Sequence, residues 1–351
     1  MRIDARHEPV VERDRVSAGA LELRTEAELS SIVPEWRRLC ERVRHCTPFQ
    51  YPEWVLPWYR AYAARDGELR AIVVRAHDAS DEIVGLAPLW RYVAADGLRR
   101  LALLGTGNTD YVDIVAAPGH ETHVLHSVVE TLRTMNDWDA CDLHPLPGTS
   151  PLLALEVPTE WSATTARDGV FPVLRVTGTA NPIDDTVPRG LLHRLRSAQR
   201  SLARRGRVQI DCADESNALD LLAELYRLHD ARWATRGTGG ILADARTRRF
   251  HVEVAPAMAA RGLLRLFVLR VDGRPVAALY GFARAERLYY YLGGFDPAFA
   301  RESVGSLVIL AAIEDGVARG AVEFDFLWGA EPYKYRWGAV DQIGYRVSIR
   351  A

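Results

Sequence analysis

Four side chains near the end of the chain can take up, donate or stabilise charge: Asp325, Glu331, Tyr333 and Lys334. Attack of an amine on a thioester needs a proton acceptor, a donor for the carbonyl oxygen and a proton for the leaving thiolate. Asp325 or Glu331 could accept the amine proton. Lys334 could stabilise the oxyanion or orient an acidic substrate, and Tyr333 could protonate the thiolate. The alternative is a set of surface salt bridges at a sheet edge, which contribute little to stability.

The segment before these residues predicts a helix with small residues at its start. Ser303, Gly305 and Ser306 precede an apolar run over residues 307–317 whose spacing is helical until Gly320 ends it. Unpaired N–H groups and the helix dipole suit an anion at such a start, and Arg301 adds a cation beside it. A simple serine N-cap explains Ser303 equally well.

Strands are predicted on both sides of this helix. Residues 288–292 form a tyrosine-rich run that ends at Gly293 and Gly294. Residues 322–328 alternate, so that Phe324 and Phe326 share one face and Asp325 lies on the other. The expected order is therefore strand, anion-binding turn, helix and strand.

This order, together with the motifs around it, resembles the GNAT-type acyltransferase half of the CelD/BioF-like and Fem peptidyltransferase group. The motifs are the tyrosine-rich strand, Phe295-Asp296-Pro297, the small-residue turn, the EFDF strand, and Gly329, Glu331, Tyr333, Lys334 and Trp337. The resemblance implies that the pyrophosphate of acyl-CoA lies on the helix N-terminus and the pantetheine arm between strands 288–294 and 322–328. The cofactor site it implies comprises Tyr291, Gly293, Gly294, Arg301, Ser303, Gly305 and Ser306. The family's Arg/Gln-x-x-Gly-x-Gly/Ala loop is not matched, because the segment from Arg301 to Gly305 is one residue too long.

Composition places the chain among globular proteins. It has 351 residues, 48% of them hydrophobic and 26% charged, a length that suits two domains. A net charge of −2 gives no overall attraction to nucleic acid or membranes, and no apolar run reaches membrane-spanning length. We expect a cytoplasmic protein. The cysteines at 40, 46, 141 and 212 are scattered, which suits reduced thiols and gives no zinc signature.

Two sections of the chain repeat one α/β unit of two strands, a third strand, a helix and a last strand with a central aspartate, Asp142 or Asp325. The predicted fold is α/β, with tandem GNAT-like domains that each have a mixed twisted sheet flanked by helices. We predict a flexible N-terminus (1–20), an N-terminal GNAT-like domain that shapes the substrate site (21–178), a linker (179–188) and a C-terminal domain that binds acyl-CoA and is catalytic (189–351). Glu121, at the start of the first unit's helix, would repel a phosphate.

Several residues are candidates for binding the acceptor. Asp110 and Asp113, with Tyr111 between them, could anchor or deprotonate an ammonium group. An Asx turn is the alternative for this stretch. Phe49 and Trp54 could wall an apolar pocket or could simply fill a core.

Trp233 precedes a glycine-rich loop, and the resemblance places this stretch near the active-site cleft, where the tryptophan could act as a lid. His120, His123 and His126 share a helical face without a partner carboxylate at a ligand spacing, so we predict no metal site. Residues 189–207 form a basic amphipathic helix that could clamp a phosphate or be a solvated face.

These observations predict an N-acyltransferase that moves an acyl group from acyl-CoA, acetyl or longer, to an amine of a small molecule or saccharide. Attack is direct, because no Ser or Cys occurs in a GxSxG or Cys/His setting. The long paired-helix insertion of tRNA-using relatives has no room here, which favours a thioester donor. The alternatives are an aminoacyl-tRNA-dependent Fem-type transferase and a non-catalytic binding module of a polysaccharide-making complex. DNA is not an expected partner, and the sequence leaves the acceptor and the oligomeric state open.

Overall fold

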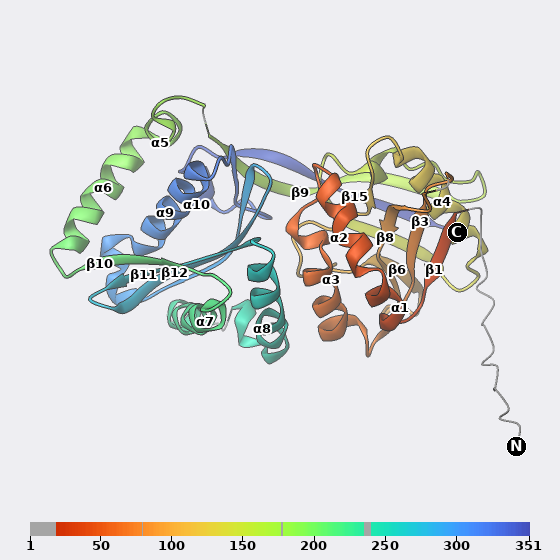
Figure 1. Ribbon diagram of the computed structural model, residues 1–351, viewed down its shortest axis with the longest axis horizontal. Coiled ribbons are helices and arrows are strands. Elements are labelled where there is room, and N and C mark those ends of the chain that lie inside the picture. The colour runs from red at the N-terminus through yellow and green to blue at the C-terminus, as the bar shows by residue number, and fades with distance from the viewer. Residues whose placement is uncertain (1–18, 79, 177, 235–239) are drawn as a thin grey trace, which may run out of the picture.

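One sheet runs through both lobes of the computed structural model, which describes residues 19–78, 80–176, 178–234 and 240–351 (Figure 1). Its strand order is β10-β11-β12-β13-β14-β9-β15-β8-β6-β5-β2, and a second sheet has the order β1-β3-β4-β7. The predicted flexible N-terminus, up to residue 18, lies outside the described residues. The predicted α/β fold, with mixed sheets flanked by helices, is confirmed.

The first lobe surrounds a core of aliphatic strands and aromatic helices. Its strands are β1 (Ala20–Leu23), β2 (Gly67–Leu69), β3 (Ala71–Arg75), β4 (Ile83–Ala87), β5 (Leu89–Val93), β6 (Arg99–Leu103), β7 (Val115–Ala116) and β8 (Ala140–Leu146). Its helices are α1 (Glu26–Ser31), α2 (Val33–Arg42), α3 (Pro52–Trp58) and α4 (Glu121–Thr134), with the π-helix η2 (Tyr59–Ala63) continuing α3 and the short η1 (Pro48–Gln50) and η3 (Pro151–Ala154) in connections.

The second lobe packs helices on both faces of its part of the sheet. Its strands are β10 (Val208–Cys212), β11 (Leu264–Val271), β12 (Arg274–Arg284), β13 (Arg287–Phe295) and β14 (Glu323–Asp325). Its helices are α5 (Pro182–Thr186), α6 (Arg189–Ala203), α7 (Ala218–Ala234), η4 (Ile241–Ala243), α8 (Ala245–Ala260), η5 (Pro297–Glu302), α9 (Val304–Ala318) and α10 (Pro332–Tyr335). Figure 1 shows α6 and α9 on one face, and α7 and α8 on the other, toward the first lobe.

The two lobes repeat one unit, in agreement with the sequence pattern. In the first, β6 and β8 pair in parallel with α4 between them in the chain, and in the second β13 and β14 do so with α9 between them. Asp142 and Asp325 lie in the last strand of each unit. Two parallel strands joined through a helix form a crossover connection, which is right-handed in nearly all proteins.

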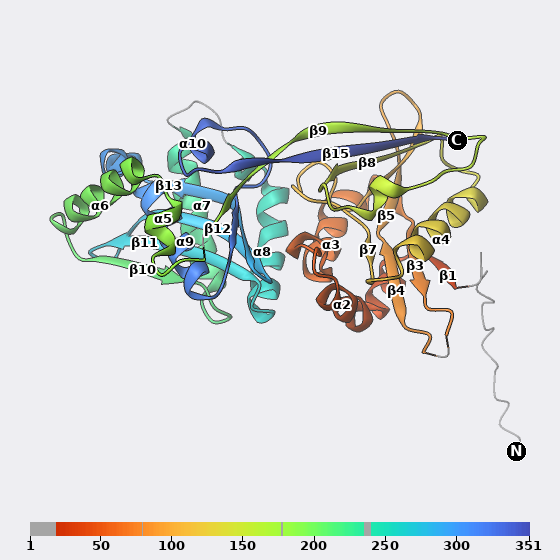
Figure 2. The same ribbon diagram turned by 90° about the horizontal axis from the view of Figure 1, so that it is seen from above.

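The lobes exchange their final strands. β9 (Ser162–Arg175) follows the first lobe in the chain but pairs with β14 of the second, whereas β15 (Val340–Arg350) ends the chain and pairs with β8 of the first. The two long strands also pair with each other, from Ser162 with Arg350 to Val173 with Val340. Figure 2 shows them as a ribbon above both lobes. The division of the chain at 179–188 stays a prediction, and the sheet crosses it.

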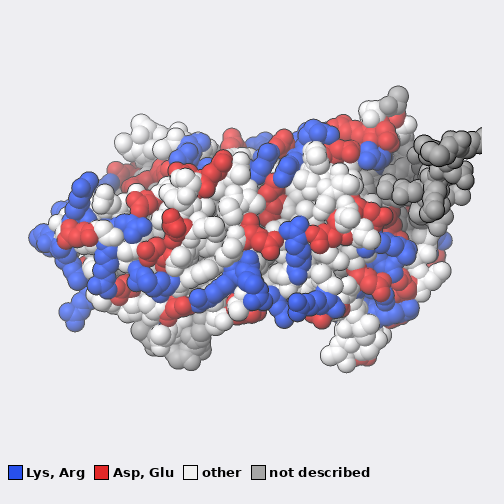
Figure 3. Space-filling model, turned by 60° about the horizontal axis from the view of Figure 1, so that its bottom comes forward, with Lys and Arg blue, Asp and Glu red and all other residues white. Residues whose placement is uncertain are grey.

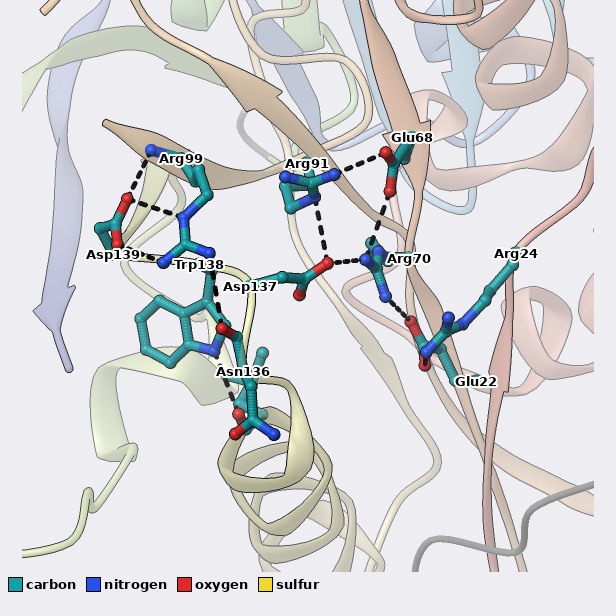
Figure 4. Close-up of polar contacts among 11 residues, drawn as sticks. Glu22, Arg24, Glu68, Arg70, Arg91, Arg99, Asn136, Asp137, Trp138 and Asp139 are labelled. Carbon is teal, nitrogen blue, oxygen red and sulfur yellow. Dashed lines mark hydrogen bonds and ion pairs between the residues drawn. The ribbon is translucent and has the colours of Figure 1, made fainter. Parts of the chain in front are cut away.

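A buried arginine joins separate parts of the first lobe (Figure 4). The side chain of Arg70 is 6% exposed and forms ion pairs with Glu22 of β1, Glu68 of β2 and Asp137, which follows α4. Arg91 of β5 pairs with Glu68 and Asp137 in turn. A guanidinium group with several donors can satisfy such a set of carboxylates at once. The network therefore fixes β1, of the smaller sheet, against β2 and β5 of the larger one.

Replacing Arg70 by leucine should lower the free energy of unfolding by about 3–5 kcal/mol, because the Glu22 side chain, 9% exposed, then keeps only the exposed Arg24 as a counterion. Arg24→Leu is the matched control: Arg24 pairs with the same Glu22, but its side chain is 64% exposed, and its loss should cost less than about 0.5 kcal/mol. Urea unfolding followed by tryptophan fluorescence measures both. Equal effects of the two changes would contradict a structural role for the network.

Candidate functional site

The two parallel strands of the second lobe separate from one another at one point. Pairing of β13 with β14 ends at Tyr289 and Asp325, and β13 continues alone on this side to Phe295. The segment after β14 turns away from β13, because Leu327 has a positive φ of 59° and its backbone N–H donates to the Asp325 carboxylate at 2.8 Å. The strand predicted over 322–328 is thus shorter than expected. The opening lies between residues 290–294 and 326–329, and we call it the strand opening.

Asp325 lies at the closed end of this opening. Its carboxylate accepts the Tyr111 hydroxyl at 2.9 Å and pairs with Arg287 at 3.4 Å, and the residue has no exposed surface. Burial raises the pKa of Asp325 to about 6, against the lowering effect of Arg287. The sequence placed this carboxylate correctly on the face away from Phe324 and Phe326. Because it is enclosed, it can hold Tyr111 and Arg287 in place but does not reach a substrate directly.

A loop of the first lobe, residues 108–110, contacts both sides of the strand opening. The Asp110 carboxylate accepts the Trp328 N–H at 3.1 Å, on one side of the opening. Two residues earlier, the carbonyl of Asn108 accepts the hydroxyl of Tyr291, on the other side, at 3.0 Å. Burial raises the pKa of Asp110 to about 7, although the Trp328 N–H and Lys334 lower it. The structure therefore brings a first-lobe carboxylate, titrating near neutrality, to the site predicted from the second lobe.

Lys334 is the only lysine in the sequence, and its ammonium group is used inside the protein. Its Nζ donates to the carbonyls of Leu327, Trp328 and Gly329 at 3.0, 2.6 and 2.9 Å, and the residue is 2% exposed. An ammonium group has three N–H donors, and all three are engaged. Lys334 therefore holds the turn that presents the Trp328 N–H to Asp110, which argues against the predicted direct contact with an oxyanion.

Glu331 and Tyr333 lie on the same side of the opening. The Glu331 side chain is 55% exposed and pairs with Lys334 at 2.8 Å. The ring of Tyr333 lies 6.2 Å from that of Phe326, and its hydroxyl interacts with Tyr290. Burial raises the pKa of Tyr333, which keeps the phenol protonated and able to donate. Both remain candidates for proton transfer.

The start of α9 lies beyond the open end of β13, with small and polar residues at its tip. Ser303 has a left-handed backbone (φ 53°) and no side-chain cap bond, so the first N–H groups of α9 are not capped by it. Gly305 lies against the Phe295 ring, where an added Cβ would be 3.4 Å from the ring, and Ser306 is partly exposed. Arg301 is exposed, and no ion pair joins it to a described residue. These features suit an anion, as predicted.

Close packing explains the paired glycines at the end of β13. A Cβ on Gly294 would lie 2.4 Å from the backbone nitrogen of His229 in α7, and one on Gly293 would lie 2.3 Å from the Tyr290 hydroxyl. The Gly293 carbonyl accepts from Arg232 at 3.1 Å. The two glycines therefore let α7 approach the sheet, in addition to any contact with a cofactor.

Four residues predicted for the acceptor side have other surroundings. Phe49 and Trp54 are 2% and 0% exposed and pack edge to face in the aromatic core between the lobes, so they do not wall an open pocket. Asp113 is 8% exposed and accepts the Ser150 hydroxyl at 2.7 Å, and burial raises its pKa to about 7. It lines a cavity of about 220 Å³ inside the first lobe. Trp233 lies beside His229 at the end of α7, and residues 235–239 of the predicted lid loop lie outside the described residues.

Sequence reasoning missed Arg287 and Trp328, which complete the site. Arg287 pairs with Asp325 and Glu323, and only the pairing of β13 with β14 reveals that these residues are neighbours. Trp328 ends the strand predicted over residues 322–328. In the structure, the turn at Leu327 directs the backbone N–H of Trp328 to Asp110. No three His, Cys, Asp or Glu side chains of the described residues converge as a metal site requires. Nor is any helix among them long and apolar enough to cross a membrane.

A cavity of about 580 Å³ lies at the lobe junction beside Tyr111 and Tyr289. Its four arginines are already bonded to the protein: Arg44 pairs with Glu286, Arg175 and Arg287 pair with Glu323, and Arg284 donates to the Tyr51 hydroxyl and to backbone carbonyls. Four arginines against two glutamates leave a formal excess of two positive charges in the lining, but each guanidinium group has a partner.

Comparison with known proteins supports the reading of the second lobe. Residues 189–335 match the model of the acetyltransferase (GNAT) domain family. No curated protein is recognisably similar in sequence. Among solved structures, FemX matches with a TM-score of 0.63 at 12% identity, over 90% of this chain and 95% of that one.

Two further structures share the fold at similarly low identity. The C-terminal domain of a candidate lysylphosphatidylglycerol synthetase from Agrobacterium fabrum gives a TM-score of 0.57 at 13% identity, over 91% of each chain. A conserved protein of unknown function from Bacteroides thetaiotaomicron gives 0.55 at 13% identity, over 93% of this chain and 98% of that one. At these identities the likeness establishes the fold of both lobes together.

Substitutions of Lys334 test whether this residue acts by directing hydrogen bonds at three carbonyls or by its positive charge alone. A planar guanidinium group cannot direct three donors at three converging carbonyls, so Lys334→Arg should destabilise the protein nearly as much as Lys334→Met. Each carbonyl left buried without a donor costs about 1–3 kcal/mol. Glu331→Gln is the control, because it removes the exposed ion pair and leaves the three bonds intact. Thermal unfolding measures all three variants, and wild-type stability of Lys334→Arg would contradict the positioning role.

Proposed function

We propose that the protein is an N-acyltransferase that uses acyl-CoA, because residues 189–335 match the model of the acetyltransferase (GNAT) domain family. The acceptor is an amine of a small molecule or a saccharide. The observation that carries the proposal is the position of Asp110, a carboxylate with a pKa of about 7 held across the strand opening by Trp328. A general base works best when its pKa lies near the working pH.

The edge of β13 that has no strand partner beyond Tyr289 offers a path for the acyl-CoA donor. From Tyr290 to Phe295 this strand spans roughly 20 Å without a partner on the β14 side. An extended pantetheine arm can add to such a backbone edge, with its thioester at the closed end near Asp325. The far end leads through η5 to the start of α9, where the uncapped N–H groups and Arg301 suit the pyrophosphate.

The residues present can carry out direct transfer. The amine nitrogen attacks the thioester carbon, a C–N bond forms and the C–S bond breaks. Asp110 accepts the proton that the amine loses, the Tyr333 hydroxyl can donate a hydrogen bond to the leaving thiolate, and the thiolate then takes a proton from water. Lys334 contributes indirectly, since it fixes the turn on which Trp328 lies.

An aminoacyl-tRNA donor is the second candidate, and the charge of α6 and its extension favours it. Residues 189–207 contain seven arginines and no acidic residue. Figure 3 shows Lys and Arg side chains gathered at the end of the molecule that this helix occupies in Figure 1. A surface of this kind attracts a polyanion through counterion release. Binding of tRNA, with no response to any CoA species, would select this candidate.

Binding of CoA tests the donor directly. Acetyl-CoA, longer acyl-CoAs and free CoA should each raise the melting temperature of the wild-type protein, because a ligand that binds the native state stabilises it by mass action. Arg301→Ala should weaken the shift. Arg319→Ala is the matched control, since Arg319 lies at the other end of α9 and pairs with Asp315. A wild-type protein that responds to none of these ligands would exclude the acyl-CoA assignment.

The pH profile tests Asp110 as the base. A base must be deprotonated to act, so kcat/KM should rise with pH through about 7, the pKa of Asp110. Asp110→Asn should remove this rise and lower kcat by about 10²–10⁴-fold. Release of free thiol from acyl-CoA in the presence of amine acceptors measures the rate. The same rise in Asp110→Asn would assign the titration to another group, and undiminished turnover would remove Asp110 from catalysis.

A further inference from the structure

A smaller cavity at the lobe junction is lined by arginines from both lobes. Its volume is about 230 Å³, and its charged lining residues are Arg60, Arg65, Asp66, Arg246, Arg249 and Glu253. Four guanidinium groups face two carboxylates, which leaves a formal excess of two positive charges. Figure 3 shows Lys and Arg side chains gathered across the middle of this face, between the lobes. We call this cavity the arginine groove.

Most of the positive charge in the arginine groove has no counterion. Arg60 pairs with Glu26 at 2.6 Å and with Glu253 at 3.0 Å. By contrast, no ion pair or side-chain hydrogen bond links Arg65, Arg246 or Arg249 to another residue in the described part of the chain, and all three are exposed. The larger cavity beside Tyr289 differs in this respect, since its arginines are already paired. The groove therefore has three guanidinium groups available for an added anion.

The local backbone brings these arginines together. Pro57 lies inside α3, and the chain continues as the π-helix η2, in which the Ala64 N–H donates to the Tyr59 carbonyl at 2.9 Å. Such π-turns are frequent at functional sites. The Tyr62 hydroxyl of η2 donates to Thr247 of α8 at 3.0 Å.

On α8 the lining residues share one helical face. Arg246, Arg249 and Glu253 are spaced by three and four residues, so they project from the same side of the helix. The contact between Tyr62 and Thr247 holds this face against η2. The groove is therefore built by contacts between the two lobes.

The groove is connected to the strand opening by aromatic side chains. The ring of Tyr62 lies 5.7 Å from Phe250, that of Phe250 lies 4.9 Å from Trp54, and that of Trp54 lies 5.3 Å from Tyr291. Tyr291 donates to the carbonyl of Asn108, two residues before Asp110. Because Phe250 and Trp54 are 1% and 0% exposed, these rings fill the space between the groove and the strand opening as a packed core.

We infer that the arginine groove is an anion site that binds a phosphate group of a nucleotide or a sugar phosphate. Guanidinium groups match phosphate oxygens with two parallel hydrogen bonds, and three unpaired ones supply the charge that a phosphate ester needs. A volume of about 230 Å³ is below that of a whole ligand site, roughly 300–1,000 Å³, so the groove suits one group of a larger molecule. The inference goes beyond the proposed function and does not rest on it.

Calorimetric titration with inorganic pyrophosphate tests the groove without donor or turnover. At constant ionic strength, the double variant Arg246→Gln/Arg249→Gln should bind pyrophosphate at least about tenfold more weakly than wild type, because it loses two charged hydrogen-bond donors. Arg38→Gln/Arg167→Gln is the matched control: it removes two exposed arginines that lie outside the groove and outside residues 189–207, and it should bind as wild type does. Equal affinity in wild type and the groove variant, or no binding to wild type, would overturn the inference.

Two further probes identify the source of the phosphate. Tighter binding of UDP than of pyrophosphate would assign a nucleotide-linked ligand, and tighter binding of glucosamine 1-phosphate would assign a phosphorylated sugar. Either result supports the groove only if Arg246→Gln/Arg249→Gln also weakens the binding of that probe. The groove variant should also keep its thermal shift with CoA, because α9 is unchanged. Loss of pyrophosphate binding with an intact CoA response thus tests the groove separately from the donor site.

Discussion

The exchange of β9 and β15 is the constraint on which the rest of the structure depends. Each strand follows one lobe in the chain and completes the sheet of the other, so the lobes cannot separate without breaking backbone hydrogen bonds at the centre of the sheet. Gly169 and Gly344 keep this ribbon close to Trp328: a Cβ on Gly169 would lie 2.3 Å from the indole, and Gly169 has a positive φ of 83°. Because the Trp328 side chain is fixed in this way, the backbone N–H of Trp328 is positioned to donate to Asp110, which comes from the other lobe.

Burial explains why three carboxylates have raised pKa values. Asp110, Asp113 and Asp325 all lie where burial removes water from the charged form, and burial is the largest cause of the shift in each. Only Asp325 has an arginine partner among the three. Buried charge costs stability unless it is paired, so the tandem arrangement maintains Asp110 at an energetic cost. The cost is intelligible if Asp110 must change its protonation state in the working pH range.

The sequence predicted the elements and the repeat well, but not the contacts between lobes. Helical and strand periodicities identified α6, α9 and the central aspartates, because each depends on local spacing. The aromatic residues Phe49 and Trp54 were ambiguous, since burial and a pocket wall need the same side chains. In the structure the Trp54 indole donates to Thr109 at 2.9 Å, so this core supports the loop that carries Asp110. The three carbonyls around Lys334 and the exchange of β9 and β15 depend on chain geometry that no local pattern encodes.

The distribution of unpaired charge separates structural cations from those available to a ligand. Arg70, Arg287 and Lys334 are each used by carboxylates or carbonyls of the protein, and each fixes two segments against one another. Arg301 at the start of α9 has no such partner among the described residues, and neither have Arg65, Arg246 and Arg249 of the arginine groove. The two places differ in what lies between them and the strand opening. The edge of β13 without a partner leads from the opening toward the start of α9, whereas the buried rings of Trp54 and Phe250 lie between the groove and Tyr291. A phosphate at the start of α9 can therefore anchor a molecule whose far end reacts at the opening, whereas an anion in the groove binds apart from that path.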